Sequence, residues 1–251
     1  MMVLAKIDEE VISSDDFVKI LRFRADYEEL VEPLLSDKLT VHAARKHGLT
    51  VTDEEVQERA DQLRRLQGLH RAKEMMDYLA DTGLTIEEYA EFVHEGLLKQ
   101  KMVEEVCSDQ AIEEYFRLHS PKFDTVEIRH IVVDSEGKAQ ELCALLEDDP
   151  DGFTDLAREH SLSSDTAAEG GLLGKLTRGT LPDDVDAKAF NAAAGDVLGP
   201  FESEDGLLFE IFQVTALHPA RLDNNTRQTV HKQVYRQWLE NRTQEHLIEI
   251  P

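Results

Sequence analysis

The first 120 residues carry apolar side chains every three or four positions, which is the spacing of an amphipathic helix, and they show almost no alternating pattern. Two Thr-x-x-Glu sequences, beginning at Thr52 and Thr85, match the capping box that opens a helix. Apart from a hairpin or extended entry over 5–13, we expect this region to be helical. The expected helices cover the segment that Ser14 caps and the ranges 27–47, 52–66, 70–80, 85–106 and 108–120.

The pattern changes near residues 121–125, where no Gly/Ser-rich or Pro-rich tether occurs. Residues 126–133 alternate and are rich in β-branched side chains, which predicts a strand, and residues 207–214 predict a second. Glycines cluster between 170 and 179. The helices expected after the change cover 138–147, 153–160, 185–194 and, as one long polar helix, 225–247.

Composition narrows the classes of partner. The 251 residues include 27 Lys and Arg against 52 Asp and Glu, a formal net charge of −25, and 41% are hydrophobic, enough for a core. Nucleic acid is a poor partner, because phosphate binding needs a basic face. The acidic excess is explained first by a soluble, self-repelling surface, and its functional interpretation is a preference for basic or unfolded clients. No run approaches the ~18 apolar residues that a membrane span requires.

The first residues of the chain and its two cysteines indicate the cellular compartment. Residues 1–5 lack the basic region and the long apolar region of a secretory signal. Cys107 and Cys143 have no CxxC or Cys/His spacing around them, so we interpret them as buried or inert thiols in a reducing compartment. Together these features predict a cytoplasmic protein.

Other chemistries are poorly supported. His42 and His47 lie five positions apart, off the i,i+4 spacing of a helical metal pair. The neighbours Glu159, His160 and Ser161 are adjacent in sequence and form no triad pattern. We therefore expect no metal and no cofactor.

Six pieces after residue 127 stand in a fixed order and carry a resemblance. They are Ile128–Val133, Phe153–Ser161, Gly170–Gly174, Arg178–Leu181, Ala189–Phe190 and Gly195–Pro200, with a turn at Gly206 and a last strand. In this order and spacing the segment resembles the parvulin-type peptidyl-prolyl isomerases over about ninety residues.

The resemblance implies an α+β fold. It consists of a mainly helical N-terminal region, a small antiparallel-sheet module with helices, and a long C-terminal helix, an arrangement similar to chaperones of the SurA/PrsA type. The implied domains are a chaperone region over 1–121, an isomerase domain over 122–220 and a C-terminal helix over 221–251 that packs back on the first region.

Prolyl isomerisation needs neither a nucleophile nor a metal. The barrier of roughly 18–20 kcal/mol reflects lost amide resonance in the twisted state. A site lowers it with an apolar slot for the proline ring and polar groups beside the rotating amide.

The resemblance also assigns site residues. His130 matches the histidine of the first strand, Ser163 falls where the family has Cys or Asp, with Asp165 close by, and Leu208 falls at the last-strand histidine. The apolar slot falls on Leu181 and Val185, with Phe190 behind them.

Two classes of function remain open at this point. The retained His130 favours an isomerase acting on Xaa-Pro bonds of an unfolded protein or peptide. A leucine at position 208 makes no hydrogen bond, which favours a catalytically weak escort that binds a polypeptide, for example during peptide maturation or export. The sequence assigns no oligomeric state.

Overall fold

A computed structural model describes residues 2–203 and 205–246. Met1 and the end of the predicted last helix, Leu247, lie outside the described residues. The chain divides into a helical unit, Met1–Ile112 with His231–Pro251, and a sheet unit, Glu113–Val230. The predicted α+β class is confirmed, while the domain limits at 121 and 220 stay predictions.

The helical unit follows the predicted periodicity closely. Both capping boxes are present: Thr52 and Glu55 each donate a backbone N–H to the other's side chain, as do Thr85 and Glu88. These bonds lower the pKa of Glu88, and a hydrogen bond from Lys101 is the largest cause that lowers the pKa of Glu55. The helices are α1 (Ser14–Phe23), α2 (Tyr27–Lys46), α3 (Asp53–Leu66), α4 (Ala72–Thr82) and α5 (Ile86–Val106); α6 (Asp109–His119) and α11 (Asn224–Glu245) contribute to both units.

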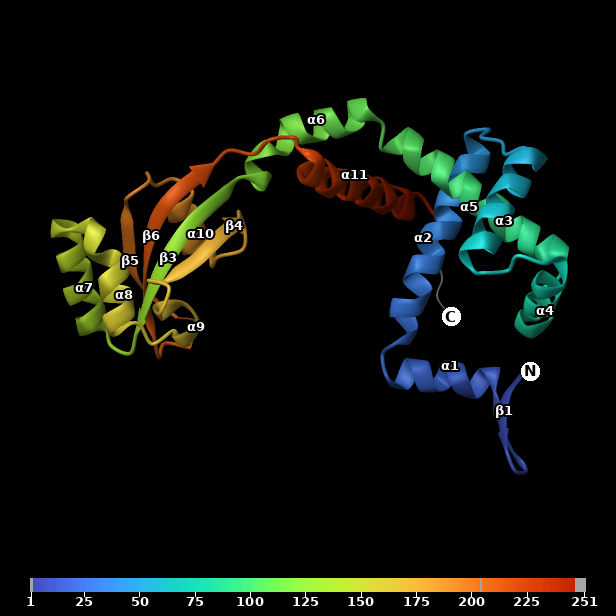
Figure 1. Ribbon diagram of the computed structural model, residues 1–251, viewed down its shortest axis with the longest axis horizontal. Helices are drawn as coiled ribbons and strands as arrows, with labels where there is room; N and C mark the ends of the chain where they lie inside the picture. The colour runs from blue at the N-terminus through green and yellow to red at the C-terminus, as the bar shows by residue number, and fades with distance from the viewer. Residues whose placement is uncertain (1, 204, 247–251) are drawn as a thin grey trace. The chain divides into compact units, whose positions relative to one another are not determined.

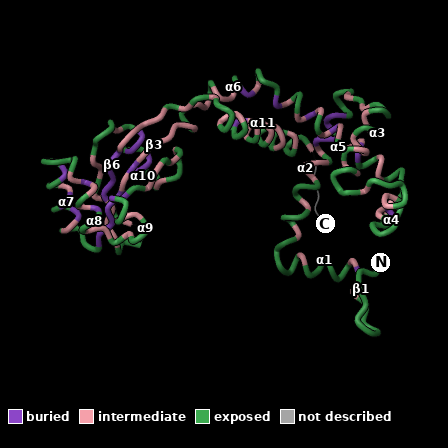
Figure 2. The backbone as a smooth tube through the Cα atoms, in the orientation of Figure 1, coloured by how far each residue is buried: buried purple, intermediate pink, exposed green. Residues whose placement is uncertain are grey.

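The core of the helical unit lies where α2 meets α5 (Figure 2). Val41, Ala44, Leu98 and Met102 are buried there, and Trp238 of α11 packs against them. The Thr40 hydroxyl, also buried, shares a 2.7 Å hydrogen bond with the hydroxyl of Tyr235. The C-terminal part of α11 thus belongs to this core.

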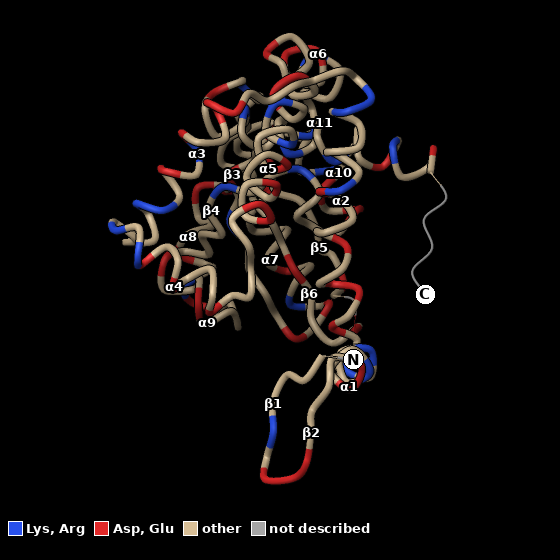
Figure 3. The backbone as a smooth tube through the Cα atoms, turned by 90° about the vertical axis from the view of Figure 1, so that its right-hand side faces the viewer, with Lys and Arg blue, Asp and Glu red and all other residues tan. Residues whose placement is uncertain are grey.

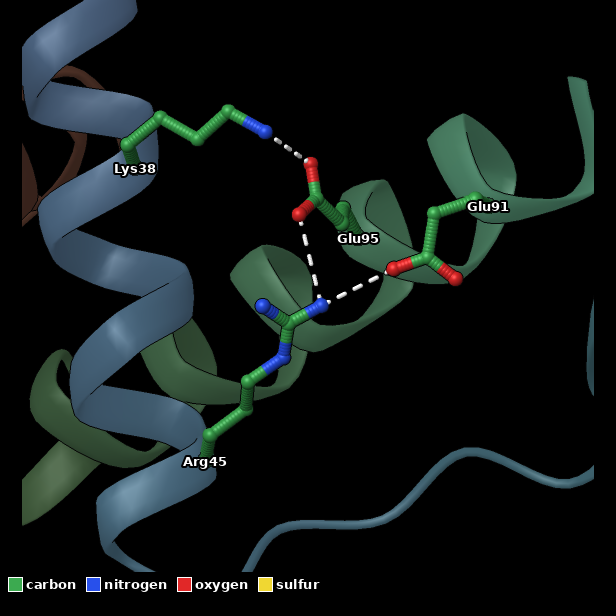
Figure 4. A network of polar contacts seen from close by, with 4 residues as sticks. All are labelled: Lys38, Arg45, Glu91 and Glu95. Carbon is green, nitrogen blue, oxygen red and sulfur yellow. Dashed lines mark hydrogen bonds and ion pairs between the residues drawn. The ribbon is translucent and has the colours of Figure 1, made fainter. Parts of the chain in front are cut away.

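A small polar network links α2 to α5 (Figure 4). Lys38 Nζ lies 2.5 Å from one carboxylate oxygen of Glu95, and Arg45 lies 3.3 Å from the other and 2.9 Å from Glu91. The hydrogen bond from Lys38 is the main cause that lowers the pKa of Glu95. Because the two cations are half exposed, such pairs add little stability.

The N-terminal segment forms a hairpin of β1 (Val3–Ile7) and β2 (Glu10–Ser13). A hairpin was one of the two structures that the sequence predicted there; the other was an extended segment. The cap of α1 is Ser13 and not Ser14: the Ser13 hydroxyl accepts the N–H of Asp16, whose carboxylate accepts the N–H of Ser13. The prediction missed by one residue because both serines precede the same acidic first turn. The Ser13 hydroxyl also donates to the Asp16 carboxylate at 2.6 Å, and this bond is the largest cause that lowers the pKa of Asp16.

The sheet unit is built on four antiparallel strands in the order β4-β3-β6-β5 (Figure 1). The two predicted strands, β3 (Thr125–Val133) and β6 (Phe209–His218), pair in its centre. The edge strands β4 (Leu172–Thr177) and β5 (Val197–Glu202) were not predicted. Glycines interrupt both, and neither shows a clean alternation of buried and exposed residues.

Each face of this sheet has its own core. Ile131, Val133 and Ile211 pack with α7 (Glu136–Asp148) and α8 (Phe153–His160). Because successive strand residues point to opposite faces, Ile128 and Phe212 pack on the other side with α10 (Asp183–Ala189). Burial of both faces explains the β-branched sequence of the central strands.

Two predicted bounds are wrong in this unit. The helix expected over 185–194 ends at Ala189, because the chain turns where the Ala193 N–H donates to Asp196 and Gly195 takes a φ of +100°. The strand expected from 207 begins at Phe209, because Leu208 and Ser203 bond to each other in the preceding turn. Short elements α9 (Ser164–Ala167) and the 3-10 turns at 120–123 and 150–152 also lacked a sequence signal.

The two cysteines are free, and burial raises the pKa of both thiols. Within the described ranges, no helix is long and apolar enough to cross a membrane.

Leu98 supplies a test of the helical core. Leu98→Ala removes a side chain that is 1% exposed, so we expect the free energy of unfolding to fall by roughly 2–5 kcal/mol. Leu66→Ala, at an 81% exposed position, should change it by less than about 0.5 kcal/mol. Urea denaturation followed by fluorescence of the single tryptophan, Trp238, measures both; equal midpoints would contradict this core.

Candidate functional site

His130 lies in the centre of the sheet unit, on β3, and is 8% exposed. Its ring Nε2 lies 2.9 Å from the hydroxyl of Thr166, and that hydroxyl donates to the hydroxyl of Ser163 at 3.0 Å. The predicted residues His130 and Ser163 therefore belong to one network. Thr166, which joins them, was missed because a lone threonine in a polar turn gives no sequence signal.

The paired glycines after α9 bring Thr166 to the histidine. The N–H of Gly171 donates to the carbonyl of Thr166 at 2.9 Å, and its carbonyl accepts the N–H of His130 at 2.8 Å. A Cβ at Gly171 would lie 2.2 Å from the carbonyl oxygen of His130, and its φ of +77° also favours glycine. The turn is thus close-packed against the backbone of the site.

Asp165 does not join this network. Its side chain is exposed and accepts a hydrogen bond from the hydroxyl of Ser164 at 3.4 Å. Because α9 is a single helical turn, neighbouring residues point in different directions, and Thr166 rather than Asp165 faces His130. The prediction that Asp165 acts in catalysis is not supported by its position.

A carboxylate lies on the other side of the histidine ring. Glu210 of β6 places Oε2 at 3.8 Å from Nδ1 of His130. In the register of β3 and β6, His130 stands opposite Phe212 and Val132 stands opposite Glu210. Glu210 is therefore the diagonal neighbour of His130 on the same face of the sheet.

Leu208 is not the last-strand residue beside His130, and this prediction needs correction. It precedes β6, and its N–H donates to the Ser203 hydroxyl at 3.0 Å. The turn before β6 extends through Leu208, so the strand begins later than the apolar pattern predicts. The pairing of β3 with β6 is not encoded in that pattern, so Glu210 was missed.

The predicted slot residues gather on the same face of the sheet as His130. Val185 and Phe190 are buried in the cluster on the α10 side, and Leu181 packs against it half-buried. Phe212 belongs to that cluster, and its ring centre lies 6.1 Å from that of His130. The polar network thus adjoins an apolar surface, although Val185 and Phe190 mainly fill the core.

Two charged side chains, Arg178 and Asp186, make contacts at the edge of the apolar surface. The guanidinium of Arg178 lies 4.1 Å from the ring centre of Phe190. The buried carboxylate of Asp186 accepts the N–H of Gly179 at 2.7 Å. These contacts fix the turn that carries Leu181.

The chemical capacity of the site is to bind and polarise an amide. A histidine ring, two hydroxyls and a carboxylate stand beside apolar side chains. No group of three His, Cys, Asp or Glu residues that could hold a metal occurs in the ranges 2–203 and 205–246.

Comparison with known protein families identifies the domain that the sheet unit contains. Residues 129–216 match the family model "Rotamase: PPIC-type PPIASE domain". The sheet unit contains a PPIC-type rotamase domain. The parvulin-type resemblance is thereby confirmed, and His130 and Glu210 both lie inside the matched residues of this rotamase domain.

Similarity extends beyond the rotamase domain. The chain is 29% identical over 219 residues to the foldase protein PrsA of Halalkalibacterium halodurans, covering 84% of this chain and 64% of the relative. The corresponding values for PrsA of Caldanaerobacter subterraneus are 27% over 191 residues, 76% and 55%. The chain thus spans under two thirds of these two relatives.

The fold also has a solved counterpart. A structure of the peptidylprolyl isomerase PrsA from Bacillus cereus superposes with a TM-score of 0.53 at 18% identity, covering 99% of this chain and 93% of that one. At this identity the likeness concerns the fold.

Gly171 offers a test of how the site is assembled. Gly171→Ala places a methyl group against the His130 carbonyl, so we expect a loss of stability of about 2 kcal/mol or more and faster exchange of the His130 amide hydrogen. Gly174→Ala is the matched control, since its φ is +84° and no atom lies within 4 Å of the place that its methyl group would take. Hydrogen exchange measured by NMR compares the two; similar protection of His130 in both variants would contradict the close approach.

Proposed function

We propose that the protein accelerates cis–trans isomerisation of Xaa-Pro bonds in polypeptide clients. The observation that carries the proposal is the hydrogen-bonded pair of His130 and Thr166 beside an apolar surface, inside a rotamase domain. The foldase relatives point to proteins as clients.

The geometry suits this reaction. When the Xaa-Pro amide twists, its nitrogen becomes pyramidal and loses conjugation with the carbonyl. Leu181 and the buried apolar cluster that it packs against, which includes Phe190 and Phe212, offer apolar contact for the proline ring. The His130–Thr166 pair offers a polar partner on the same face, and polar groups fixed in advance favour the twisted state over the planar one.

A binding role alone is the second candidate, and one observation favours it. Large apolar side chains stand exposed along the N-terminal hairpin and α1, with Phe23 92% exposed. An unfolded segment could cover them. Acidic residues spread over the backbone in Figure 3 suit basic clients.

The test is an NMR-exchange assay on Xaa-Pro peptides that differ in the residue before proline. We expect the full chain to accelerate exchange and His130→Ala to lower kcat/KM on the order of 100-fold, because a preorganised polar partner is lost. His218→Ala is the matched control: this histidine also bridges β3 and β6, with Nε2 2.9 Å from Glu127, but near the other end of the strands.

Either result separates the two candidates. Acceleration that His130→Ala removes and His218→Ala preserves supports the isomerase. Peptide binding without acceleration by the wild-type chain would contradict it and leave the binding role.

A further inference from the structure

The β6 residue beside the His130 ring is a carboxylate, where the family resemblance implies a second histidine. We propose that Glu210 is a positioning residue of the isomerase site: it acts through His130, engaging Nδ1 while Thr166 engages Nε2. This role rests on the proposed isomerase function. The resemblance placed the last-strand partner at Leu208, which precedes β6, so Glu210 received no role from it.

The hydrogen bonds fix which ring nitrogen faces which partner. The Thr166 hydroxyl has one hydrogen and donates it to Ser163, so it accepts a hydrogen bond from Nε2–H of His130. Nδ1 faces Glu210, whose Oε2 lies 3.8 Å away, so the carboxylate pairs with this nitrogen when the ring carries a proton there as well. The contact with Glu210 is therefore an ion pair of the protonated imidazole, and α9 and β6 together hold the ring from two sides.

The surroundings make this contact stronger than an ordinary surface pair. The His130 side chain is 11% exposed and that of Glu210 is 34% exposed, so water screens the pair only partly. Two cations on this side of the sheet have other contacts: Arg178 lies over Phe190, and Lys188 Nζ lies 4.6 Å from the ring centre of Phe201.

The register of the two central strands places Glu210 where it can act. His130 and Phe212 are direct cross-strand partners, and Glu210 is the next residue of β6 on that face. A leucine at this place would carry no charge, whereas a carboxylate can pair with a protonated imidazole. Leu208 suggested that His130 has no polar partner on the last strand. The pairing of β3 with β6 shows that Glu210 takes that place.

The same two strands provide a matched control pair. Glu127 of β3 and His218 of β6 also form a cross-strand contact of 2.9 Å, and their side chains are about equally exposed, at 42% and 41%. Glu127→Gln thus removes a carboxylate from a His–Glu pair of the same sheet without touching His130.

The experiment measures Glu210→Gln, Glu210→Ala and Glu127→Gln in the full chain. We expect both Glu210 variants to lower kcat/KM for an Xaa-Pro peptide about tenfold, mainly through kcat, because a charged partner of His130 is lost while the apolar slot is intact. Long-range ¹H–¹⁵N spectra of the histidine rings should show the His130 signals moving in Glu210→Gln and staying in place in Glu127→Gln.

The outcomes separate this inference from the function on which it rests. Unchanged kcat/KM and unmoved His130 ring signals in Glu210→Gln would overturn the role of Glu210 while leaving the isomerase in place. A fall in kcat/KM without any change at the ring would also overturn it, since Glu210 would not act through His130. A wild-type chain that does not accelerate exchange would overturn the proposed function itself.

Discussion

The antiparallel pairing of β3 with β6 is the constraint on which the rest of the sheet unit depends. It fixes which side chains share a face, so that Ile131 and Ile211 turn toward α7 and α8 while His130, Glu210 and Phe212 turn toward α10. A slip of one residue would exchange the two faces and bury a charged side chain in a core. The same pairing therefore builds both cores and the polar network.

The network is held by backbone contacts rather than by long side chains. The N–H of His130 donates to the carbonyl of Gly171, and the N–H of Gly171 donates to the carbonyl of Thr166. The short α9 is thereby tied to the central strand, with the Thr166 hydroxyl within hydrogen-bond distance of the ring. Glycine is needed at 171 because the His130 carbonyl leaves no room for a Cβ, and at 170 because the Thr154 side chain fills that place.

The sequence predicted what depends on local pattern. Helical periodicity and capping boxes located α2 to α5, and the β-branched runs located β3 and most of β6. His130 was identified through the resemblance, which places a histidine on the first strand. The edge strands β4 and β5 were missed, since glycines dilute their pattern. Glu210 and Thr166 were missed for a different reason: each becomes part of the site only through the register of distant segments, which no local spacing encodes.

The central claim is that a client proline binds on the α10 face of the sheet, beside His130. Titrating a ¹⁵N-labelled full-length chain with an Xaa-Pro peptide and mapping the amide signals that move tests this directly. The account predicts shifts at His130, Thr166, Leu181 and Phe212, with the α7 and α8 amides unmoved. Shifts confined to α7 and α8, or to the helical unit, would contradict it.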